Sequence, residues 1–315
     1  MTGALRAADH ASEPNALPPS VGVFAAVVED LDRRLRAIDD SKLDLFWAWE
    51  TYDEEGVRFG ILRTTEQVGD AAVEIAARRA AAGIAPTIAG RILGRYAVAW
   101  RELWSVADRA DPAIDTPPFD GEWPLRTILD HLIDADIGFL GTIRNGLEQA
   151  RAGNLRAAPV GSDEALMALA GLEEGPWQAA LRGSLDDIRE FHRLVRDRIL
   201  DALGAISDGE LDITSPFWDG RRPNRFRLGR FESHLRQHTI QTEKAVQEII
   251  GAPREVERLL RLLARALGDV EAASLGADAA IVEPVLAPLA AEIATRAPEL
   301  EAATRVESAP APAGT

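Results

Sequence analysis

The chain has 315 residues, of which 46% are hydrophobic and 27% are charged, and it carries a net charge of −16. This composition is typical of a globular protein that buries one large core or two small ones, and the negative charge disfavours nucleic-acid backbones and anionic membranes as partners. Cysteine is absent, which excludes disulfides, cysteine-ligated metals and a thiol nucleophile supplied by this chain.

The two ends of the chain have the composition of disordered tails, which we place at residues 1–19 and 305–315. The N-terminal segment carries Arg6, Asp9 and Glu13 where a signal peptide requires an uninterrupted apolar stretch. No apolar run has the length needed to span a bilayer. We therefore expect a cytoplasmic protein.

Between the tails, apolar residues recur at three- and four-residue spacing in a background rich in alanine, leucine, arginine and glutamate. This pattern predicts amphipathic helices rather than strands. No Gly/Ser-rich linker interrupts residues 20–304, so we predict a single all-α domain. The predicted helices span about 20–38, 41–53, 57–82, 86–110, 123–151, 176–205 and 227–250, followed by one from 254 and one or two shorter helices. Residues 110–122 and 215–224 are predicted to be irregular.

The helix predicted at 123–151 carries a histidine beside its apolar stripe. His131 follows Ile128 by three residues and precedes Ala135 by four, so it points toward the interior of a bundle. Such a residue is either a core histidine hydrogen-bonded to a carbonyl or a metal ligand. The predicted buried stripe consists of Leu125, Ile128, Leu132, Ala135 and Phe139.

A second feature is FESHLRQHTIQTEKAV, residues 231–246, which places His234 and His238 one helical turn apart. Imidazoles at positions i and i+4 of a helix can reach one ion, and Gln241 lies on the same face. Two histidines make an incomplete site. His192 is flanked by charged residues and is predicted to be a surface or boundary residue. His131 is the candidate third ligand, although spacing alone leaves its core role open.

Just before this pair, RRPNRFRLGR, residues 221–230, contains five arginines and no acid. One interpretation is a solvated loop whose arginines pair with nearby carboxylates. The other is a small anion site, in which Arg227 and Arg230 share the face of His234 and bind an anionic group of a substrate or cofactor.

The surroundings of the histidines resemble a known family. GEWPLRTILDHLIDADIGF is similar to the second-helix pattern of the DinB/YfiT-like four-helix-bundle superfamily, with a Trp about two turns before a histidine in an xxHLxxA context. SHLRQHTIQ resembles the last-helix pattern of the same superfamily, His-x3-His followed three residues later by Gln. The resemblance covers about residues 86–250, which leaves 20–85 as an N-terminal extension and 254–304 as C-terminal helices.

The resemblance implies a DinB-like four-helix bundle in which His131, His234 and His238 hold a divalent transition metal, Zn²⁺ or Ni²⁺ by ligand type. The family includes mycothiol-dependent maleylpyruvate isomerase and is associated with mycothiol- or bacillithiol-dependent transferases. The isomerase branch has a carboxylate in place of one histidine of the pair, whereas this chain has His234 there. Asp134 and Gln241 are then the candidates for groups that hold a metal ligand in place or transfer a proton, with ordinary solvent or packing roles as the alternative.

These observations leave three hypotheses for the function. The first is a metal-dependent transferase or isomerase that uses an external thiol, or a hydrolase that uses metal-bound hydroxide. The second is a non-catalytic bundle that binds a metal or a ligand, and the third is a metal-free helical interaction protein. We expect a small-molecule substrate, no nucleic acid or membrane as a partner, and allow for a homodimer.

Overall fold

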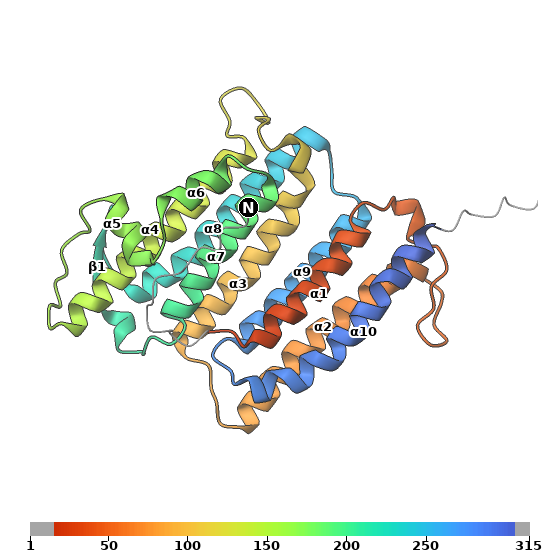
Figure 1. Cartoon of the computed structure of the whole chain (residues 1–315), viewed down its shortest axis with the longest axis horizontal. Helices are drawn as coiled ribbons and strands as arrows, with labels where there is room; N and C mark the ends of the chain where they lie inside the picture. Colours follow the sequence, from red (N-terminus) through yellow and green to blue (C-terminus); the bar gives the residue numbers. More distant parts are fainter. Residues whose placement is uncertain (1–15, 306–315) are drawn as a thin grey trace, which may run out of the picture.

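The structure is a computed structural model that describes residues 16–305 (Figure 1). The predicted all-α class is confirmed, since the sole sheet in this range is a two-stranded hairpin. Most of the two predicted tails lies outside the described residues. In chain order the elements are α1 Pro19–Leu35, η1 Asp40–Lys42, α2 Gly56–Ala81, α3 Ile88–Ala107, η2 Asp108–Ala113, α4 Leu125–Arg151, α5 Asp163–Ala170, α6 Glu174–Leu181, α7 Leu185–Leu203, η3 Glu210–Asp212, β1 Thr214–Phe217, β2 Gly220–Pro223, α8 Asn224–Ile250, α9 Glu255–Ser274 and α10 Ala279–Arg305.

Four of these helices, α3, α4, α7 and α8, enclose the first hydrophobic core. Trp100, Leu132, Ile188 and Phe231 come from one helix each and are buried in it. Full burial of such a side chain is worth about 1.5–3 kcal/mol, so this core accounts for the association of helices that are far apart in sequence. The short helices α5 and α6 pack on the outside, against α4 and α7 respectively.

The helices outside the predicted family core form a second four-helix bundle. Here α1 packs against α10 and α2 packs against α9, beside the first bundle (Figure 1). Phe24, Ile61, Leu260 and Ile293 are fully or almost fully buried in its core. The N-terminal extension and the C-terminal helices are therefore parts of one bundle and not separate additions.

The two bundles meet along α3 and α9, where glycines allow the helices to approach closely. A Cβ atom at Gly268 would lie 2.7 Å from the Cα atom of Val98, which is closer than side chains tolerate. The same contact buries Glu271, which accepts hydrogen bonds from Arg101 Nη2 at 2.6 Å and from Arg196 Nη2 at 3.1 Å. Close backbone packing and a buried ion-pair cluster thus connect the two cores.

The helix predicted at 41–53 is wrong. The segment forms the single 3-10 turn η1, in which the side chain of Asp39 accepts a hydrogen bond from Ser41 N–H, and then reverses at an isolated bridge between Trp49 and Tyr52. Glu50 has a φ angle of 54°, which a right-handed helix cannot contain. The local turn chemistry overrides the apolar periodicity of the segment.

Two other predicted elements have different bounds. The helix expected at 176–205 is broken, because Ser184 and Asp187 form a capping box that starts α7 after the end of α6. In place of the one or two shorter helices expected at the C-terminus, the structure has a single 27-residue helix, α10, which continues through three internal prolines.

The segment 215–224, predicted to be irregular, contains the hairpin of β1 and β2. Phe217 pairs with Gly220, and Trp218 and Asp219 form the two-residue turn. Gly220 has a φ angle of 92°, which favours glycine. Within residues 16–305, no helix combines the length and the hydropathy that a membrane span requires.

Candidate metal centre

Helix α8 brings His234 and His238 to the inner face of the first bundle. It begins after Pro223 and ends at Ile250, where the following Gly251 has a φ angle of 90° that a helix cannot continue through. Its buried positions follow three- and four-residue spacing, and both histidines fall in this series with side chains that are 7% exposed. The amphipathic pattern that buries Phe231 and Leu235 thereby also directs the two imidazoles inward.

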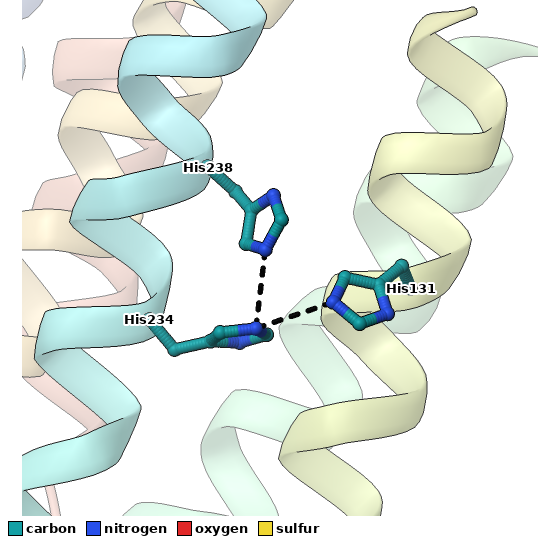
Figure 2. Close-up of side chains that lie close together, drawn as sticks. All are labelled: His131, His234 and His238. Carbon is teal, nitrogen blue, oxygen red and sulfur yellow. Dashed lines mark hydrogen bonds between the residues drawn. The ribbon is translucent and has the colours of Figure 1, made fainter. Parts of the chain in front are cut away.

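Helix α4 supplies the third histidine from the opposite side. It starts after Pro124, whose missing N–H costs nothing at a helix start. The predicted stripe of α4 is buried at Leu125, Ile128, Leu132 and Phe139 and half-buried at Ala135. His131 borders this stripe, is half-buried, and faces α8 (Figure 2).

The three imidazoles converge through the same ring nitrogen. The Nε2 atom of His234 lies 3.2 Å from Nε2 of His131 and 3.1 Å from Nε2 of His238 (Figure 2). Nitrogens bound at the usual Zn–N length lie about 3.3 Å apart at a tetrahedral angle and about 2.9 Å apart at a right angle. These two distances therefore fit ligands of one ion, and the candidate ligand atoms of all three histidines lie within 4.8 Å of one another. No other group of metal-ligating side chains with such convergence occurs in the described part of the chain.

Burial and neighbouring positive charges favour the neutral form of the two imidazoles of α8. Burial, and then the proximity of His238, His131 and Arg230, lowers the pKa of His234 to about 3. The pKa of His238 is also lowered, by burial and by the positive charge of His131 and Arg230, against the opposing effect of its hydrogen bond to Gln241. A neutral imidazole has a free lone pair, which is the form that binds metal.

Gln241 holds the ring of His238. Its Oε1 atom lies 2.7 Å from Nδ1 of His238, so the ring donates from Nδ1 and Nε2 is left as the acceptor that faces the cluster. Asp134, the other candidate for such a supporting group, is exposed on α4 and makes no hydrogen bond to the three histidines. Partial desolvation and the nearby carboxylates of Asp163 and Asp130 raise the pKa of Asp134.

The two predicted anion-binding arginines have different environments. Arg227 is completely buried, and its Nη2 atom donates to the Asp219 carboxylate at 2.9 Å and to the carbonyls of Ser215 and Gly220. These bonds anchor the hairpin through Nη2, whereas Nε and Nη1 of Arg227 are buried and have no hydrogen-bond partner among residues 16–305. Arg230 is half-buried, makes no ion pair among residues 16–305, and lies close enough to act on both histidines of α8.

A pocket of about 460 Å³ adjoins the histidine cluster. Two of its lining residues contact the candidate ligands, because the Trp123 ring lies edge-on to His131 with centroids 5.4 Å apart and Gln241 holds His238. The sequence indicated Trp123 only as part of the family pattern. Its position immediately before the proline that starts α4 was the available signal for a residue at the mouth of the bundle.

His192, predicted to be a surface or boundary residue, is instead completely buried. Its Nε2 atom lies 3.3 Å from the Asp136 carboxylate, which also accepts a hydrogen bond from the Tyr96 hydroxyl at 2.6 Å, and Trp104 donates to its Nδ1 atom. His192 follows Ile188 by four residues on the buried face of α7, so helical periodicity outweighs its charged sequence neighbours. It is a core residue and does not join the cluster.

The fold and the site define a helical bundle with three converging histidines contributed by two of its helices. Residues 95–242 match the family model of the DinB superfamily, and this range contains all three histidines. The matched segment, which holds most of the first bundle, is thus DinB-like. No curated protein and no solved structure matches the chain.

Proposed function

We propose that this protein is a metal-dependent enzyme in which His131, His234 and His238 hold one Zn²⁺ or Ni²⁺ ion. The observation that carries the proposal is the convergence of the three imidazoles. Nε2 of His234 lies 3.2 Å from Nε2 of His131 and 3.1 Å from Nε2 of His238, and the candidate ligand atoms of all three lie within 4.8 Å of one another. Neutral nitrogen ligands suit these ions better than Mg²⁺ or Ca²⁺, which prefer oxygen. When bound by three imidazoles, such an ion retains its full charge and acidifies a water or an external thiol.

The residues around the cluster support catalysis over a purely structural site. Structural zinc sites are usually closed by four protein ligands, whereas the described part of the chain offers three here and a pocket beside them. Gln241 orients His238, and Trp123 covers the edge of His131. The reaction that we propose is a transfer or isomerisation with an external low-molecular-weight thiol such as mycothiol or bacillithiol, or a hydrolysis.

Elemental analysis of protein purified without an affinity tag or added metal tests the metal site. We expect close to one first-row transition ion per chain, and a loss of affinity by orders of magnitude in His234→Ala and His238→Ala, because two ligands rarely hold such an ion. His192→Gln is a control, since His192 lies outside the cluster. Unchanged metal content in the double His234→Ala, His238→Ala protein would exclude the site.

The second candidate function is a bundle that binds metal or ligand without turnover. It is favoured if spectroscopy of the purified protein finds a fourth protein ligand that closes the coordination shell. A protein whose stability and ligand binding are unaffected by chelation supports the third hypothesis, a metal-free interaction protein.

A further inference from the structure

The pocket beside the histidine cluster combines an apolar wall with one accessible cation. The apolar wall is formed mainly by Phe119, Trp123 and Ile240, which are 58%, 42% and 57% exposed. Apolar side chains that gather at the wall of a pocket are typical of a ligand-binding site. The cation is Lys244, and only two of the 35 basic residues of the chain are lysines.

Lys244 has no partner of its own in the described part of the chain. It is exposed on α8 and takes part in no hydrogen bond or ion pair among residues 16–305, whereas the neighbouring Glu243 is paired with Arg261. Its ammonium group is therefore available to an anion that enters the pocket. Glu122, which also lines the pocket, is likewise unpaired and opposes such an anion by repulsion.

The position of Lys244 sets the geometry of a ligand. Lys244 follows His238 by six residues on α8, which corresponds to about 9 Å along a helix axis. Gln241 and Trp123 line the pocket and contact His238 and His131, so the pocket lies beside the histidine cluster. A molecule that places an anionic group on Lys244 can lie against the apolar wall and present its other end to the cluster.

We propose that this pocket binds the substrate, and that the substrate is a small molecule with a flat apolar body and one anionic group that pairs with Lys244. The assignment rests on the proposed metal-dependent function for the reacting end of the molecule. In this proposal Lys244 binds the anionic group and the wall of Trp123 and Ile240 contacts the apolar body. Neither contact requires the metal.

Calorimetric titration of 2-naphthoate at low salt tests the assignment, with the neutral 2-naphthalenemethanol as the matched probe. We expect Lys244→Gln to weaken naphthoate binding about threefold and Lys244→Glu about tenfold, because an exposed ion pair is lost and then replaced by repulsion. Glu122→Gln should tighten it about twofold. Binding of the neutral alcohol should be the same in all three variants and the parent, and should fall in Trp123→Ala.

The control is Arg225→Glu, which makes the same change of charge at an exposed position near the start of the same helix. It should leave naphthoate binding unchanged. Absence of saturable binding to the parent protein, or equal affinity in Lys244→Glu and the parent, would overturn the proposal. So would naphthoate binding that is lost on removal of metal and unaffected by Lys244→Glu, since the carboxylate would then bind the ion.

The failure of the metal site and the failure of this pocket can be told apart. If the protein contains no metal and still binds naphthoate through Lys244, the assignment of the pocket is supported and the proposed metal-dependent reaction is wrong. If the protein holds metal through the three histidines but binds naphthoate equally well with Lys244 or with Lys244→Glu, the metal site is supported and the assignment of the pocket is wrong.

Discussion

At His238 the proton on the ring is placed by a single hydrogen bond. Nδ1 donates to Oε1 of Gln241 at 2.7 Å, so Nε2 keeps its lone pair toward the cluster. Loss of such a supporting contact typically lowers metal affinity by about 10–100-fold. We expect this decrease in Gln241→Ala and a smaller one in Gln241→Glu, which keeps an acceptor, as measured by competition with a chelator. Equal affinities of Gln241→Ala and the parent would show that packing alone orients His238.

At His234 the buried environment makes the stability of the metal-free protein depend on pH. The folded-state pKa is about 3, whereas an unfolded histidine titrates near 6.5. Below about pH 6.5 the unfolded chain therefore binds a proton that the folded chain does not, and the free energy of unfolding falls by up to about 1.4 kcal/mol per pH unit from this residue. Urea melts with chelator at pH 7.5 and 5 should show a steeper loss for the parent than for His234→Gln. Parallel losses would contradict the low pKa.

At the scale of elements, Arg227 ties the hairpin of β1 and β2 to α8. Its buried guanidinium holds Asp219 and two hairpin carbonyls, and removal of one partner of a buried ion pair costs about 3–5 kcal/mol. We expect Arg227→Ala to lower the free energy of unfolding by about 3 kcal/mol while the folded protein keeps its metal stoichiometry. The exposed Arg225→Ala is the control and should change stability by less than about 0.5 kcal/mol. A metal-loaded Arg227→Ala protein as stable as this control would remove the structural role assigned to Arg227.

The same hairpin shows where prediction from the sequence stops. Long helices such as α4 and α8 were predictable because their apolar periodicity extends over many turns. Strands of four residues that contain Pro216 and Pro223 offer no alternation to detect, and their pairing depends on a turn at Gly220 and on tertiary contacts. The break before α7 had a local signal, Ser184 with Asp187, that helical periodicity concealed.

The candidate site could be predicted from the sequence where its residues lie on one face of a helix. The spacing of His234, His238 and Gln241 places them together without knowledge of the fold. The contribution of His131 required the antiparallel packing of α4 against α8, which the family resemblance provided and residue spacing did not. The burial of Arg227 and the pocket around Lys244 depend on the loop 108–124 and the hairpin, whose positions are set by tertiary packing.

In the whole molecule, the second bundle is held to the first by buried charge. Burial alone would raise the pKa of Glu271, but Arg101 and Arg196 hold it below its usual range, so the carboxylate stays ionised between the two cores. Arg101 also pairs with Glu29 of α1, which extends the cluster into the second bundle. Because Arg101 and Arg196 belong to α3 and α7, the cluster spans the boundary between the two bundles.

This arrangement predicts that zinc stabilises the entire chain although its candidate ligands lie in one bundle. A ligand that binds only the folded state raises the melting temperature. Because the α3–α9 contact joins the two bundles, zinc bound to the first should also stabilise the second. Calorimetry should therefore show one transition whose midpoint rises with zinc. In Glu271→Ala, Arg101 and Arg196 lose their shared carboxylate, at a cost of about 3–5 kcal/mol. We expect two transitions in that variant, of which only one shifts with zinc. The control Glu283→Ala changes an exposed residue and should show the single transition of the parent. Two separate transitions in the parent protein, or a single zinc-dependent transition in Glu271→Ala, would show that Glu271 does not couple the bundles.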